Sequence, residues 1–90
     1  MQIIQAGKAG DFMTSVSLLL DTTEKAMTFV KDVSRYSENM DMEEGRSFID
    51  AKSMLGIFSL NLRKPVTLHI YADGIRADEI IGGLNKYIYS

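Results

Sequence analysis

The chain has 90 residues, of which 46% are hydrophobic and 24% are charged, and its formal net charge is −2. This length and composition predict one small globular domain and leave no room for a second. The slightly acidic balance gives no broad positive field for nucleic acid. The absence of cysteine excludes disulfides and thiolate metal sites, and with a single histidine any metal site would have to be built from carboxylates. We therefore expect neither metal nor cofactor. Because apolar runs fall far short of the roughly 20 residues of a membrane helix, we expect a cytoplasmic protein that does not enter a membrane.

The first twelve residues differ from the rest of the chain. They read MQIIQAGKAGDF, with two glycines and one short apolar pair, and they lack an apolar stretch of signal-peptide length. We therefore expect residues 1–12 to form a loosely ordered leader and residues 13–90 to form the domain.

The first regular pattern begins at Met13 and predicts a half-buried strand, because Val16 and Leu18 alternate with serines. The next four residues, 21–24, have the spacing of a capping box, with Asp21 as the cap and Glu24 reaching back. The helix that follows has an apolar stripe at three- and four-residue spacing. The stripe consists of Ala26, Phe29, Val30, Val33 and Tyr36.

Further along, Met40 and Met42 alternate with polar residues, and Gly45 offers a turn to a return strand over residues 46–50. A short helix is expected after Ser53. Pro65 opens another strand, in which Val66, Leu68 and Ile70 face one way and Thr67, His69 and Tyr71 face the other. After a turn at Asp73-Gly74, a last helix has the stripe Ala77, Ile80, Ile81, Leu84 and Ile88, weakened by Gly82-Gly83 unless close packing compensates. The predicted order is strand, helix, strand, strand, short helix, strand, helix, which is an α+β fold with helices on one face of an antiparallel sheet.

The stretch Ile49–Leu60, IDAKSMLGIFSL, has too many large apolar residues for one helix face. With Met54 at zero and 100° per residue, Phe58 falls at about 40°, Leu55 at about 100° and Ile57 at about 300°. We therefore expect at least one of these four side chains to face solvent as a docking surface.

This stretch resembles the regulatory-serine segment of HPr, the small phosphocarrier of the bacterial phosphotransferase system, whose pattern is roughly N-x-K-S-[IM]-[ML]-G-[LIV]-[MF]-S-L. Residues 50–60 depart from that pattern only at Asp50. The resemblance extends from about Met13 to Ile88 and implies an open-faced sandwich: a four-stranded antiparallel sheet covered on one face by three helices. It also implies that an HPr kinase phosphorylates Ser53 and that the short helix docks on protein partners, a transcriptional regulator among them. The implied docking residues are Lys52, Met54, Leu55, Gly56, Ile57 and Phe58.

The site for which the family is named is degenerate. HPr-like carriers have H-A-R-P at the start of the first helix, where the histidine accepts phosphate from enzyme I. Here Thr22, Thr23 and Glu24 occupy that region, and Asp21 and Glu24 place negative charge where phosphate would have to bind. A threonine phosphoester also lacks the transfer potential of phosphohistidine. We therefore expect no phosphate relay.

Several alternatives remain open. Ser53 is equally well explained as a helix cap, worth about 1 kcal/mol. His69 is interpreted as an ordinary histidine on the outer face of a strand, because no partner for it is evident in the sequence. The favoured function is a regulatory or adaptor protein related to the phosphotransferase system that binds partners through the Ser53 helix. The alternative is a structural or homo-oligomeric domain with no such role. An enzyme is not expected, because no nucleophile lies at recognisable spacing from a base.

Overall fold

A computed structural model describes residues 13–89, so the expected leader lies outside the described residues. The described chain has four strands, three α-helices and one short 3₁₀ helix. In chain order these are β1 (Thr14–Leu18), α1 (Thr23–Val33), β2 (Met40–Glu44), β3 (Ser47–Asp50), α2 (Met54–Phe58), β4 (Val66–Ile70), α3 (Gly74–Gly83) and the 3₁₀ helix Asn85–Tyr87. This order is the predicted one.

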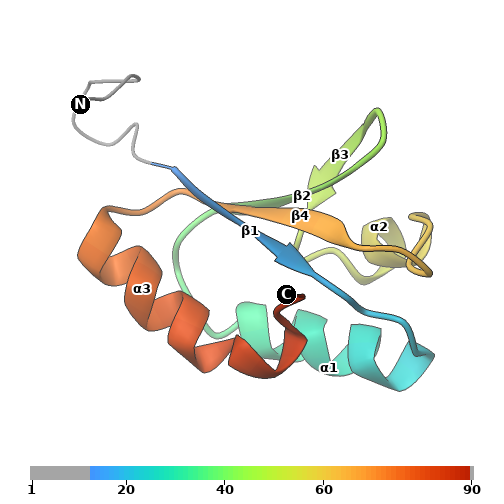
Figure 1. Cartoon of the computed structure of the whole chain (residues 1–90), viewed down its shortest axis with the longest axis horizontal. Helices are drawn as coiled ribbons and strands as arrows, with labels where there is room; N and C mark the ends of the chain where they lie inside the picture. Colours follow the sequence, from blue (N-terminus) through green and yellow to red (C-terminus); the bar gives the residue numbers. More distant parts are fainter. Residues whose placement is uncertain (1–12, 90) are drawn as a thin grey trace.

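The four strands form one antiparallel sheet in the order β1-β4-β2-β3, with α1 and α3 beneath it in Figure 1. Leu68 pairs with Val16 on one side and with Met42 on the other. These alternating apolar positions face the helices, and Val66, Leu68 and Ile70 are all buried. The predicted register is confirmed, because a slip of one residue would have turned the whole set to the opposite face.

The core lies between the inner face of the sheet and the three helices. Most of the two predicted stripes lies in this core, as Ala26, Phe29, Val30 and Val33 of α1 and Ala77 and Ile80 of α3. Tyr36 and Ile88, which were expected to continue these helices, lie beyond their ends and are half-buried. Phe29 meets Tyr87 edge to face with ring centroids 5.3 Å apart. Tyr87, whose burial was not predicted, follows α3 in the 3₁₀ helix and is almost fully buried. Its hydroxyl donates to Asp32 at 2.6 Å, so the ring is buried while its polar end is satisfied.

The start of α1 differs by one residue from the prediction. Thr22, not Asp21, is the cap, and its side-chain oxygen accepts from the Lys25 amide at 3.0 Å. Asp21 instead pairs with the Lys25 ammonium at 3.1 Å, an exposed contact one helical turn away. The prediction for Asp21 was wrong because Asp21 and Thr22 are both good caps, and spacing alone does not choose between them.

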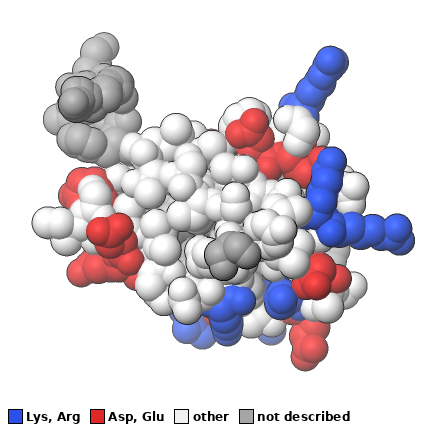
Figure 2. Space-filling model, viewed as in Figure 1, with Lys and Arg blue, Asp and Glu red and all other residues white. Residues whose placement is uncertain are grey.

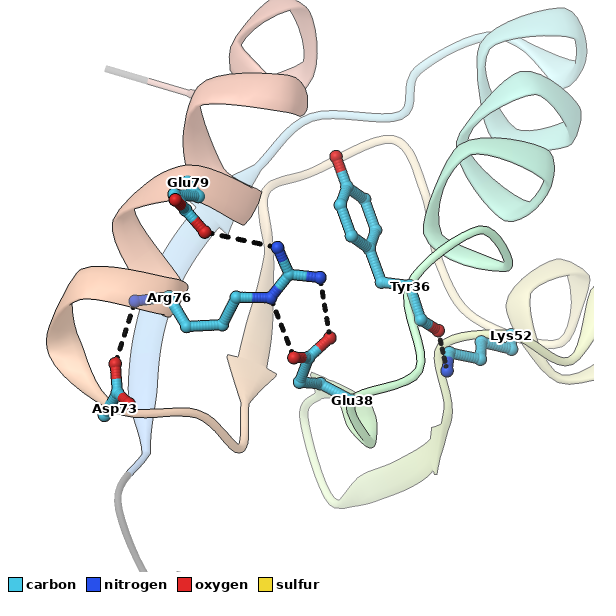
Figure 3. A network of polar contacts seen from close by, with 6 residues as sticks. All are labelled: Tyr36, Glu38, Lys52, Asp73, Arg76 and Glu79. Carbon is cyan, nitrogen blue, oxygen red and sulfur yellow. Dashed lines mark hydrogen bonds and ion pairs between the residues drawn. The ribbon is translucent and has the colours of Figure 1, made fainter.

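A polar network connects the start of α3 with the segment that links α1 to β2 (Figure 3). Arg76 donates from Nε to Glu38 at 2.8 Å and from a terminal nitrogen at 3.3 Å, and its guanidinium lies over the Tyr36 ring. These hydrogen bonds from Arg76 hold the pKa of the Glu38 carboxyl below its usual value. A Cβ added to Gly83 would overlap the Tyr36 hydroxyl. Gly83, which was expected to weaken the helix, therefore lies where the helix packs closely against Tyr36.

Candidate functional site

The candidate site starts from the short helix α2 and the turn before it. The Asp50 side chain accepts from the Lys52 amide at 2.9 Å, which turns the chain at the end of β3. Ser53 follows in an extended conformation, and its hydroxyl accepts from the Gly56 amide at 3.1 Å. Ser53 is therefore the cap of α2, as the sequence predicted.

The apolar residues of α2 divide between the core and the surface. Ile57 is fully buried, Met54 is half-buried against the core, Leu55 is 87% exposed and Phe58 is 41% exposed. The prediction that at least one of the four faces solvent is confirmed. Because Ile57 lies in the core, it can only support a docking surface from beneath.

Lys52 and Gly56 are held by contacts inside the domain. The Lys52 ammonium donates to the Tyr36 carbonyl at 2.6 Å, as Figure 3 shows, so it is half-buried and not freely solvated. A Cβ on Gly56 would lie 3.1 Å from the Ser53 hydroxyl and 3.2 Å from the end of the Ile49 side chain. Gly56 therefore permits close approach of side chains of its own domain.

The degenerate phosphohistidine region lies next to α2. A hollow of about 270 Å³ is lined by Leu20, Asp21, Thr22 and Thr23 on one side and by Phe58, Leu60, Asn61, Leu62 and Arg63 on the other. Thr22, Thr23 and Glu24 are all exposed. The fold thus brings the start of α1 and the end of α2 to one surface, although about 35 residues separate them in sequence.

Residues 61–64 form the expected polar connection after α2 and border this hollow, but their contacts with β2 were not predicted from the sequence. Glu44, at the end of β2, accepts from the Asn61 amide at 3.1 Å and pairs with the Lys64 ammonium at 3.6 Å. These contacts fix residues 61–64 beside the hairpin. Because they join segments far apart in the chain, no local pattern in the sequence could have indicated them.

Charge is unevenly distributed around the domain. In Figure 2, acidic side chains gather at the left, where α3 begins, and long basic side chains extend at the right, on the side of α2. Arg63 and Asp21 both line the hollow beside Phe58, and Lys64 is paired with Glu44. The exposed apolar residues of α2 therefore border a surface of mixed charge that includes the Arg63 guanidinium.

His69 lies on the outer face of the sheet, as predicted, but it is only 9% exposed. Its Nδ1 lies 2.6 Å from the Ser15 hydroxyl, and its Nε2 lies 2.7 Å from a carboxylate oxygen of Glu43. Phe48 stacks on the ring with centroids 5.6 Å apart. The expectation of an ordinary surface histidine was wrong, because side chains from three strands cover and bond it.

Within residues 13–89, no helix is long and apolar enough to cross a membrane. The same residues contain no group of three or more histidine or carboxylate side chains placed to hold a metal ion.

Comparison with known proteins gives one family. The family model described as the PTS HPr component phosphorylation site matches residues 23–90. Among solved structures, the phosphocarrier protein HPr of Bacillus anthracis is 21% identical, with a TM-score of 0.69 over 86% of this chain and 98% of that chain. HPr of Thermoanaerobacter tengcongensis is 25% identical, with a TM-score of 0.63 over 86% of this chain and 90% of that chain. The histidine-containing phosphocarrier protein of Mycoplasma is 19% identical, with a TM-score of 0.60 over 83% of this chain and 89% of that chain.

Proposed function

Because the chain belongs to the HPr family of the phosphotransferase system, we propose that it is a cytoplasmic regulatory or adaptor protein that binds protein partners through α2 and does not relay phosphate through a histidine. The observation that carries this proposal is the 87% exposure of Leu55, two residues from Ser53, on a helix whose other face is in the core. An exposed apolar side chain on a short, well-anchored helix is suited to be the central anchor of an interface.

The lack of a phosphate relay is supported by the start of α1. A carrier needs an imidazole there, whereas this chain has Thr22 and Thr23, and its single histidine is on β4 with both ring nitrogens in contact with neighbours. The Thr22 hydroxyl oxygen already accepts the Lys25 amide of the first turn. A phosphoryl group at the start of α1 would lie close to the carboxylates of Asp21 and Glu24. The Lys25 amide would not be free to donate to it, because that amide is already bonded to Thr22.

The docking surface that we propose consists of Leu55, Phe58 and the hollow between Phe58 and Thr22. Arg63 lines the hollow, so a partner with an acidic residue beside its apolar contact would fit this surface. Among the partners that the family implies, an HPr kinase and a transcriptional regulator would each have to contact Ser53 and its neighbours.

Phosphorylation of Ser53 is the regulation that this surface supports. A phosphate would add about −1.5 to −2 charges two residues from Leu55. The ammonium of the adjacent Lys52 is bonded to the Tyr36 carbonyl and would have to leave it in order to pair with the phosphate. The modification would therefore alter both the charge of the docking surface and its connection to α1.

The test uses purified HPr kinase with ATP, and separately enzyme I with phosphoenolpyruvate. We expect the kinase to label the chain, a Ser53→Ala variant to remain unlabelled, and enzyme I to leave both unlabelled. Leu55→Glu should lower kcat/KM for the kinase by about 30-fold or more, since an anchor commonly contributes 2 kcal/mol.

The matched control is Ile75→Glu, which places the same charge at an 80% exposed isoleucine on α3. It should leave kcat/KM unchanged. An acid-labile phosphate on His69 would contradict the absence of a relay. Failure of the kinase to label Ser53 would favour the alternative, a structural domain that keeps α2 because the fold requires it.

A further inference from the structure

The outer face of the sheet is an acidic surface with aromatic side chains. The strand register places two rows of side chains across it: Ser15, His69, Asp41 and Asp50 in one, and Ser17, Thr67, Glu43 and Phe48 in the next. These rows contain three carboxylates and no lysine or arginine. No described helix covers this face, because all three helices pack on the other one.

Phe48 is held in place on this face. It is 59% exposed, yet its ring stacks on His69, which is itself fixed by contacts to Ser15 and Glu43. A buried polar group whose bonds are all satisfied is rigid. An exposed aromatic ring on a rigid support loses little entropy on binding and therefore makes a good apolar anchor.

Asp41 and Asp50 lie directly opposite each other on β2 and β3. Like charges at such positions destabilise a sheet. Neither carboxylate has a lysine or arginine partner among the residues of the described chain. Each is oriented by one neutral donor, Asp41 by the Tyr71 hydroxyl at 2.9 Å and Asp50 by the Lys52 amide at 2.9 Å, and each retains free lone pairs.

A hollow lies at the same place. It has a volume of about 320 Å³ and is lined by Asn39, Met40, Asp41, Asp50 and Tyr71. It therefore combines two opposed carboxylates, an amide, an aromatic ring and room for a side chain.

We propose that this hollow binds an arginine side chain of a protein partner, while Phe48 packs against an apolar residue next to that arginine. A guanidinium can donate to two carboxylates at once from its planar fork and can lie over the face of Tyr71. It would also neutralise the repulsion between Asp41 and Asp50. Arginine is favoured over lysine because an ammonium is a compact, strongly hydrated charge that cannot form bidentate bonds.

This surface does not include α2, and the inference does not depend on the proposed function. The arginine proposed to bind here has the opposite charge to the acidic residue that Arg63 beside α2 would accept. A partner that uses both surfaces would therefore have to carry separate acidic and basic segments.

The experiment is a titration of the isotope-labelled full chain followed by ¹H–¹⁵N NMR, with the peptide acetyl-Gly-Leu-Arg-Leu-Gly-amide as the probe. The control peptide has citrulline in place of arginine, which keeps the shape and removes the charge. We expect saturable shifts at Asn39, Asp41, Asp50 and Tyr71 with the arginine peptide. The affinity of the citrulline peptide should be lower by at least about tenfold, the factor that corresponds to loss of one charge-assisted hydrogen bond.

The double variant Asp41→Asn/Asp50→Asn should lose at least about tenfold in affinity for the arginine peptide. The double variant Glu24→Gln/Asp78→Asn removes the same net charge from exposed helical positions and should bind within about twofold of the parent. Equal binding of the two peptides, equal losses in the two double variants, or no saturable shift at the four residues would each overturn the proposal.

Discussion

The two adjacent glycines at the end of α3 should respond to alanine in opposite directions. A Cβ at Gly82 would have no atom within 4 Å, and Gly82 does not adopt the positive φ that favours glycine. Alanine is better than glycine by about 1 kcal/mol in a helix interior, and about half of that is expected in the last turn. Gly82→Ala should therefore raise the free energy of unfolding by about 0.5 kcal/mol and Tm by about 2–4 °C.

Gly83→Ala gains the same helix propensity, but its Cβ would overlap the Tyr36 hydroxyl. Tyr36 cannot move without cost, because its ring lies under the Arg76 guanidinium, 5.5 Å from the ring centroid, and its carbonyl accepts the Lys52 ammonium. Such overpacking typically costs about 1–3 kcal/mol. The net change in the free energy of unfolding should be a loss of about 1 kcal/mol.

Tyr36→Phe removes the overlapping oxygen and leaves the ring carbon Cζ at 3.6 Å from the added Cβ, an ordinary contact. Gly83→Ala in the Tyr36→Phe background should therefore be as stabilising as Gly82→Ala. Thermal melts followed by circular dichroism on the single and double variants give the coupling energy, which should be about 1 kcal/mol or more. If Gly83→Ala stabilised the chain that retains Tyr36, or if the two changes were additive, the packing explanation would be refuted.

Three further changes test other contacts. Asp50→Asn keeps the side-chain oxygen that orients the turn and removes the repulsion from Asp41, so thermal melts at pH 7 should show a gain of about 0.5 kcal/mol. Ser53→Ala removes the α2 cap, and chemical denaturation should show a loss of about 1 kcal/mol. Burial and the bond to Asp32 raise the pKa of Tyr87, so its contribution to stability is complete below pH about 10 and is lost as the pH rises further; Tyr87→Phe should reduce this alkaline loss in melts between pH 9 and 12.

The sheet register could be predicted from the sequence because it depends on a strict local pattern. Val66, Leu68 and Ile70 alternate with polar residues, and only one pairing puts all three against the helices. The hairpin could be predicted from an equally local pattern. Gly45 is the one described residue with positive φ, at 60°, and it lies where the turn was expected. Patterns with a period of two thus predicted most of the architecture.

The candidate sites depend on contacts between distant segments, and these were not predicted. His69 was assigned to the outer face but not to its partners, because Ser15 and Glu43 lie 54 and 26 residues away in the chain. The burial of Tyr87 was missed for a different reason. It lies after Gly82-Gly83 in a 3₁₀ helix, where the 3.6-residue period of α3 no longer applies.

The proposed function requires a docking surface on α2 that persists without a phosphate acceptor at the start of α1. Ser53 caps α2 through the Gly56 amide, a hydrogen bond that does not involve α1, and Ile57 anchors the helix in the core. Thr22 in turn satisfies an amide of α1 by itself. Because each helix start is capped by its own residue, we expect replacement of the acceptor residue at α1 to leave the cap of α2 in place. Under the proposed function, partner binding at α2 and phosphate transfer at α1 are therefore separable properties of this fold.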